Sequence, residues 1–142
     1  MNYRFYGADS LSIKPIDECF SFVKDQRHLY DLLSECWSKK TCAPRLRINW
    51  SKDNMTLGQC SITAFLVQDI FGGKVYGVPL EDGNYHCFNK IGDVTFDLTS
   101  EQFGELKLDY HHVKEQFRED HFSKAEKYER YLLLKDRLLE KK

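Results

Sequence analysis

The segment Ile62–Phe71 constrains the fold of this chain more than any other part of the sequence. Seven of its ten residues are apolar, and they are spread around a helix instead of along one stripe. A helix with this pattern is surrounded by protein on most sides. The pair Gly72-Gly73 supplies the stop signal that follows it. The sequence therefore predicts a buried helix near the centre of the fold.

The pattern then changes to short alternating segments, which indicate strands. These segments are Lys74–Leu80, Tyr85–Ile91 and Val94–Leu98, and turn signals at Glu81–Asn84 and Gly92-Asp93 separate them. Strands joined by turns this short run antiparallel, so we expect a small antiparallel meander.

Helices are predicted on both sides of this centre. Apolar residues at helical spacing favour a helix over Asp25–Trp37. A capping box at Thr99–Gln102 predicts a short helix that ends near Gly104, and a second box at Ser123–Glu126 predicts the start of a C-terminal helix. Met1–Pro15 carries no clear pattern, and part of it is expected to be loose.

Length and composition favour a single domain over residues 1–142, and the mixture of predicted helices and strands favours an α+β fold. The chain has 21 Lys and Arg against 22 Asp and Glu, which argues against a nucleic-acid binder. Its longest uninterrupted apolar runs have four residues, so no membrane span is expected. The five cysteines include no Cys-x-x-Cys pair, which predicts free thiols in the cytoplasm and neither metal nor cofactor. The oligomeric state stays open.

One cysteine occupies a position that favours reactivity. Cys60 follows Gly58-Gln59 where a loop rich in breakers meets the buried helix, which places it in the first helical turn. Unpaired backbone N–H groups and the positive end of the helix dipole stabilise a thiolate there. Gly58 leaves room for a substrate backbone to approach. The alternative is an inert buried cysteine.

Strand parity brings His86 and Asp97 to one face of the predicted sheet. If Gly92-Asp93 is a two-residue turn, counting outward places Phe88 opposite Asp97, and His86 shares a face with Phe88. Diagonal neighbours of this kind are within reach of planar side chains. A carboxylate on one ring nitrogen would leave the other nitrogen as a base. Alternatively, Asp97 satisfies nearby backbone and His86 is structural.

The remaining cysteine and histidine residues near these segments are assigned no chemistry. Cys87 and Asn89 alternate to the opposite face of their strand and are interpreted as structural. His111, His112 and His121 are expected to be solvated, and their spacing to Cys60 and His86 matches no zinc site.

Several short motifs together resemble the YunG-like group of small bacterial proteins, over roughly residues 29–103. The motifs are Trp50-Ser51, Gly58-Gln59-Cys60, Thr63-Ala64, Val67-Gln68-Asp69, Gly72-Gly73, His86-Cys87-Phe88-Asn89 and Asp97-Leu98-Thr99. Their order also resembles the core of papain-like and transglutaminase-like enzymes, which implies an α+β fold with a papain-like (transglutaminase-like) core. That resemblance implies Cys60 as nucleophile, His86 as base and Asp97 as the residue that orients it. It also implies Asn54 or Gln59 as a side-chain donor to the oxyanion, beside the backbone N–H of Cys60.

The resemblance leads to two functional hypotheses. In the first, the protein is a cysteine hydrolase or acyltransferase of peptidase, amidase or transglutaminase type, which acts on an amide or peptide acyl group, including that of a protein, through a thioester. In the second, it is a non-catalytic binding protein that keeps the fold, with Tyr110–Lys142 as a partner surface. A wide gap between the sulfur and the imidazole, or a sulfur without a cleft, would favour the second.

Overall fold

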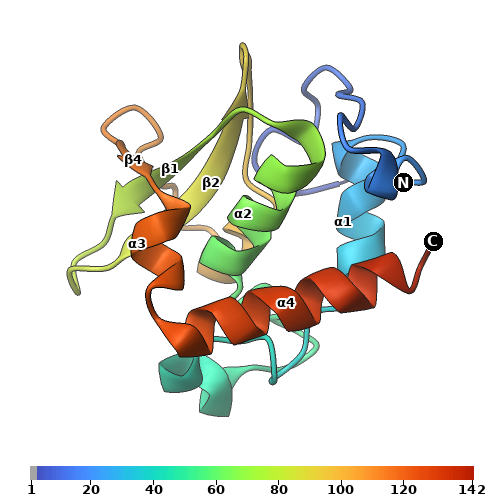
Figure 1. Cartoon of the computed structure of the whole chain (residues 1–142). Helices are drawn as coiled ribbons and strands as arrows, with labels where there is room; N and C mark the ends of the chain where they lie inside the picture. Colours follow the sequence, from blue (N-terminus) through green and yellow to red (C-terminus); the bar gives the residue numbers. More distant parts are fainter. Residues whose placement is uncertain (1–2) are drawn as a thin grey trace.

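A computed structural model describes residues 3–142 and shows an α+β fold around a four-stranded antiparallel sheet (Figure 1). The strands lie in the order β3-β2-β1-β4. Their bounds are Lys74–Pro79 (β1), Tyr85–Ile91 (β2), Val94–Phe96 (β3) and Lys114–Gln116 (β4). The α-helices are Gln26–Ser34 (α1), Cys60–Phe71 (α2), Arg118–Phe122 (α3) and Ala125–Leu139 (α4). Short 3-10 helices cover Glu18–Phe20 (η1), Pro44–Asn49 (η2) and Ser100–Phe103 (η3).

Helix α2 lies at the centre of the molecule, against β2 on one side and α4 on another (Figure 1). Ile62, Phe65 and Leu66 are completely buried, because neighbouring elements cover the helix on several sides. The predicted central helix is thus confirmed, and it begins at Cys60, which the sequence places in its first turn. Gly72 follows it with a positive φ of 83°, as its place at the helix end requires.

The turn between β2 and β3 has the predicted geometry. Ile91 pairs with Val94, and Asn89 pairs with Phe96, so Gly92 and Asp93 form a two-residue connection. Strand β3 ends at Phe96, earlier than expected. The chain beyond it is still extended enough for Asp97 to form an isolated bridge with Tyr6. The parity on which the His86–Asp97 prediction depends is therefore confirmed.

Two helix boundaries differ from the prediction. Helix α1 ends at Ser34 instead of Trp37. Its start is capped by the Asp25 side chain, which accepts from the His28 N–H at 3.0 Å. Ser123 does not cap α4. Its hydroxyl donates to the Asp120 carbonyl at 2.8 Å, since this residue ends the short helix α3, which the sequence patterns did not predict.

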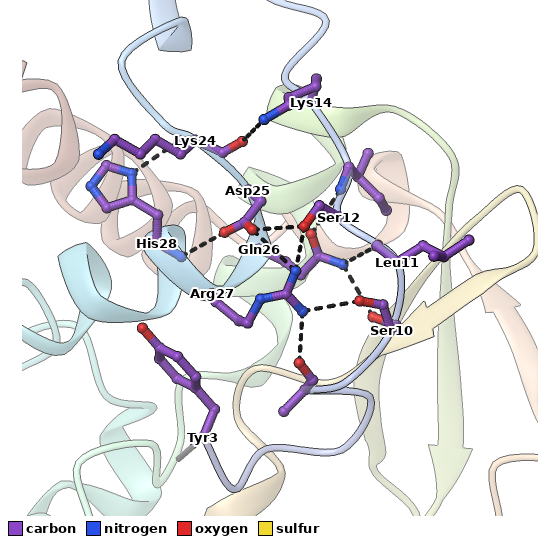
Figure 2. Close-up of polar contacts among 12 residues, drawn as sticks. Tyr3, Ser10, Leu11, Ser12, Lys14, Lys24, Asp25, Gln26, Arg27 and His28 are labelled. Carbon is purple, nitrogen blue, oxygen red and sulfur yellow. Dashed lines mark hydrogen bonds and ion pairs between the residues drawn. The ribbon is translucent and has the colours of Figure 1, made fainter. Parts of the chain in front are cut away.

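The segment before α1 is docked, which corrects the expectation that it is loose; Met1 and Asn2 lie outside the described residues. Figure 2 shows how two side chains of α1 hold it. The Gln26 amide donates to the Leu11 carbonyl at 2.7 Å, and the Arg27 guanidinium donates to the carbonyls of Ala8 and Ser10 at 2.7 and 3.0 Å. Phe5 is buried in the core. The N-terminal segment thus lies beside the end of β3, where Tyr6 forms the isolated bridge with Asp97.

Within residues 3–142, no helix is both long enough and apolar enough to cross a membrane. All five cysteines are free thiols.

Candidate active site

Cys60 is the first residue of α2 and faces a cavity of about 780 Å³ that His86 also lines. The thiol is half-buried. The first turn of a helix carries backbone N–H groups without intrahelical partners, so the sulfur lies beside ready hydrogen-bond donors. Gly58 serves this arrangement through its backbone: its φ is 71°, and a Cβ there would lie 2.6 Å from the Cys42 sulfur. The glycine is therefore required by conformation and packing at this turn.

His86 and Asp97 form a buried hydrogen bond. The His86 Nε2 lies 2.6 Å from the Asp97 Oδ2, and each residue is only 1% exposed. The same carboxylate oxygen accepts from the Tyr110 hydroxyl at 2.8 Å, while Oδ1 accepts from the Thr99 N–H at 3.2 Å. Because a carboxylate only accepts, the His86 Nε2 must carry a proton. These donors, together with the Thr99 hydroxyl at 3.3 Å from Oδ1, fix Asp97, which in turn orients the imidazole.

The second ring nitrogen of His86 is free for chemistry. Its Nδ1 is buried and has no hydrogen-bond partner among residues 3–142. Phe103 packs edge-on against the ring, with centroids 4.7 Å apart, and limits how the imidazole can rotate. Nδ1 is thus the nitrogen available to exchange a proton with Cys60 or with a molecule in the cavity.

The charges at the site favour a thiolate and an imidazolium. Burial lowers the pKa of His86, but the Asp97 carboxylate and the Cys60 thiolate outweigh burial and raise it to about 10. The neighbouring Cys87 and the positive charge of His86 hold the pKa of Cys60 well below its usual range, against the opposing effect of burial. Both shifts act towards a thiolate–imidazolium pair, which is the reactive form of a cysteine.

Cys87 has the buried, structural place that the sequence predicts, and it also affects the pKa of the neighbouring Cys60 thiol. It is buried on the face of β2 that packs on α2. The neighbouring Cys60, together with burial, raises the pKa of Cys87 well above the usual value, which favours its protonated form. Asn89 on the same face keeps its predicted structural role, since its amide donates to the Ala64 carbonyl at 2.8 Å.

The structure gives no support to Asn54 and Gln59 as oxyanion donors, because neither side chain lines the cavity. Gln59 is completely buried, and its amide donates to the Ser38 carbonyl at 3.1 Å. Asn54 belongs to a tight turn in which its N–H donates to the Ser51 carbonyl. The backbone N–H of Cys60, in the first turn of α2, is the donor that remains beside the sulfur.

The sequence patterns missed Tyr110, and they also missed the neighbouring side chains of His121 and Lys127. His121 was expected to be solvated, but it is half-buried and lines the cavity with Lys127. Burial and the charge of Lys127 lower the pKa of His121 to about 4. Neither residue carries a local motif, and only the docking of α3 and α4 brings them to Cys60. In the described part of the chain, no three His, Cys, Asp or Glu side chains group as metal ligands.

Comparison with known proteins places these residues in a family. The family model described as "YunG protein" matches residues 25–142, which include every residue of the site. A protein of Bacillus subtilis (strain 168), "Uncharacterized protein YunG", is 31% identical over 86 residues, which cover 61% of this chain and 69% of that protein. No solved structure matches the chain. The match to the family model covers most of the sequence, and the chain belongs to the YunG family.

Proposed function

We propose that this protein is a cysteine-dependent hydrolase or acyltransferase that acts on an amide or peptide acyl group through a thioester. The observation that carries the proposal is the buried His86–Asp97 hydrogen bond of 2.6 Å beside a half-buried Cys60 at the edge of a cavity. A cysteine that opens a helix, a histidine on a following strand and an aspartate after the next strand also occur in this order in papain-like and transglutaminase-like enzymes. That order supports assigning the core to a papain-like fold.

In the first half of the proposed reaction, the Cys60 thiolate attacks the carbonyl carbon of the bound amide. A C–S bond forms, and the carbonyl oxygen becomes an oxyanion that the backbone N–H of Cys60 can stabilise. The His86 imidazolium then gives its Nδ1 proton to the amide nitrogen, the C–N bond breaks and the amine leaves. The thioester and a neutral imidazole remain.

In the second half, the neutral His86 accepts a proton from the incoming nucleophile. Attack by water yields a carboxylic acid, whereas attack by an amine yields a new amide, and either step returns the electron pair to the Cys60 sulfur. Asp97 holds the ring in the same tautomer throughout, because its carboxylate stays bound to Nε2. We propose a peptide or protein amide as the substrate and the reducing cytoplasm as the location, which free thiols at all five cysteines support.

The competing proposal is a binding protein that uses the same fold without chemistry. Such a protein has no need of a buried ionisable pair, which is expensive to desolvate. The cavity beside Cys60 and the free Nδ1 of His86 therefore favour the enzyme. The two proposals differ in what they predict for the reactivity of the Cys60 thiol.

The pH dependence of Cys60 alkylation by iodoacetamide tests the proposed function. Peptide mass spectrometry follows Cys60 separately from Cys19, which is exposed and serves as an internal reference. We expect a midpoint for Cys60 at least about 2 pH units below that of a free cysteine, near pH ~8.5, and a large upward shift in His86→Ala. His112→Ala is the matched control, since His112 forms a similar pair with Asp109 on the surface. A midpoint near that of Cys19, unchanged in His86→Ala, would refute the enzyme and leave the binding protein.

A second assay detects acyl transfer itself. Incubation with p-nitrophenyl acetate should place an acetyl group on Cys60, with release of p-nitrophenolate, and Cys60→Ser should abolish the adduct. Acetylation of Cys19 without acetylation of Cys60 would contradict the assignment of the nucleophile.

A further inference from the structure

A second line of polar side chains borders the cavity that contains Cys60. Gln116, His121 and Lys127 come from β4, α3 and α4, and all three line this cavity. The Lys127 Nζ lies 2.9 Å from the His121 Nδ1, and the His121 Nε2 lies 2.9 Å from the Gln116 Oε1. Three elements thus meet to hold one lysine at the edge of the cavity.

The direction of these hydrogen bonds leaves Lys127 as the donor. The Gln116 oxygen only accepts, so the His121 Nε2 carries a proton, and the neutral ring presents a lone pair at Nδ1. An ammonium has three N–H donors, and His121 takes one of them. Lys127 therefore keeps unused donors while its long side chain is held in place.

The acidic side chains around the cavity are not partners of Lys127. Within residues 3–142, no carboxylate forms an ion pair with it, because Glu126 binds Arg130 at 2.5 Å and Asp82 faces Arg45 at 3.7 Å. Asp120 also lines the cavity but is exposed to solvent. Burying part of a cation without a counter-charge costs free energy, and a bound anion would offset that cost.

Lys127 is also near enough to the reacting sulfur to sense its charge. Burial lowers the pKa of Lys127, and a negative charge on the neighbouring pair of thiols, Cys87 and Cys60, acts in the opposite direction. His86 already provides the cation that pairs with the thiolate. The free donors of Lys127 are thus left for a group on the molecule that enters the cavity.

We propose that Lys127 binds a carboxylate of the substrate, so that the site selects amides that carry a carboxylate close to the scissile carbonyl. This inference rests on the proposed function and adds a substrate class to it. His121 and Gln116 act as positioning residues that hold the lysine before the substrate arrives. Such preorganisation reduces the cost of ordering a flexible side chain on binding.

Two alkylating reagents of nearly equal size test this proposal. Iodoacetate carries a carboxylate and iodoacetamide a neutral amide, and both form the same S–C bond with loss of iodide. The measured quantity is the ratio of their rate constants at Cys60, divided by the same ratio at the exposed Cys19. Because both reagents react with the same thiolate, changes in its pKa and nucleophilicity cancel in this ratio.

We expect the normalised ratio to favour iodoacetate and to fall about tenfold in Lys127→Gln, which can still donate to His121. Lys127→Met should give the same loss, and Lys127→Arg should keep most of the preference. Lys124→Met is the matched control, because Lys124 is an exposed lysine beside the same cavity, and its ratio should change less than about twofold.

An unchanged ratio in folded Lys127→Gln and Lys127→Met would overturn the proposal. If the Cys60 midpoint is still depressed in those variants, the proposed function survives and only the role of Lys127 fails. If Cys60 of the unmodified protein reacts like Cys19 with both reagents, the proposed function fails first.

Discussion

Asp97→Asn should remove the negative charge that favours a His86 imidazolium beside the Cys60 thiolate, while it preserves the shape of the side chain. Burial lowers the pKa of His86, yet Asp97 and Cys60 together raise it from 6.5 to about 10. At about 1.4 kcal/mol per pKa unit, this difference corresponds to about 5 kcal/mol in favour of the imidazolium. Without the Asp97 charge, burial remains and only Cys60 opposes it, so the pKa of His86 should fall well below 10. The imidazolium that pairs with the thiolate is then less stable.

The assay is the midpoint of the pH profile for Cys60 alkylation by iodoacetamide. The midpoint is preferable to the rate at one pH, because a less acidic thiol gives a more nucleophilic thiolate, which offsets its smaller population. We expect the midpoint to rise by at least about 2 pH units in Asp97→Asn. Asp109→Asn is the matched control, since Asp109 binds His112 on the surface at 2.5 Å. A folded Asp97→Asn protein whose midpoint stays within about half a unit of the parent would refute the reasoning.

Three further variants separate stability from chemistry. Tyr110→Phe removes a hydrogen bond to the Asp97 carboxylate, so the free energy of unfolding in urea should fall by about 1.5–3 kcal/mol; a shift in the Cys60 midpoint as large as that of Asp97→Asn would contradict this. Asn89→Ala deletes the buried amide that donates to the Ala64 carbonyl and should cost about 1–3 kcal/mol in the same measurement, with the midpoint unchanged; a shifted midpoint would mean that Asn89 acts at the site. Because the folded pKa of His121 is lowered to about 4 from 6.5, this residue contributes stability above pH 6.5 that is lost as the pH falls towards 4. His121→Gln should therefore show a smaller decrease in Tm between pH 7 and pH 5, and an equal decrease would show that the ring is not buried in its neutral form.

The parts of the site that the sequence predicted depend on short-range regularities. The period of a strand is two residues, and a tight turn fixes the register, so counting from Gly92-Asp93 was enough to place His86 and Asp97 on one face. The apolar pattern of α2 and the glycines beside it placed Cys60 in the first helical turn. Each of these arguments spans only a few residues of chain.

The residues that were missed are brought together by tertiary packing. Tyr110 reaches Asp97 from an irregular segment, and Lys127 reaches the cavity from α4, with no spacing rule to connect either of them to Cys60. Gln59 shows the opposite case. It adjoins the proposed nucleophile in sequence, but the backbone at the helix start turns its side chain towards Ser38. The predicted capping box of α4 shows a similar limit. A capping box is a local pattern, and here its Ser123 hydroxyl binds the end of the preceding helix α3 instead of the start of α4.

The protonation state of His86 tests the central claim most directly. Nitrogen-15 NMR of the histidine rings distinguishes an imidazolium from either neutral tautomer, and comparison with His86→Ala identifies the signals. We expect both ring nitrogens of His86 to carry protons from about pH 6 to above pH 9, and we expect Cys60→Ser to lower the upper limit of this range. A neutral His86 ring at pH 7.5, unaffected by Cys60→Ser, would contradict the thiolate–imidazolium pair and the chemistry that depends on it.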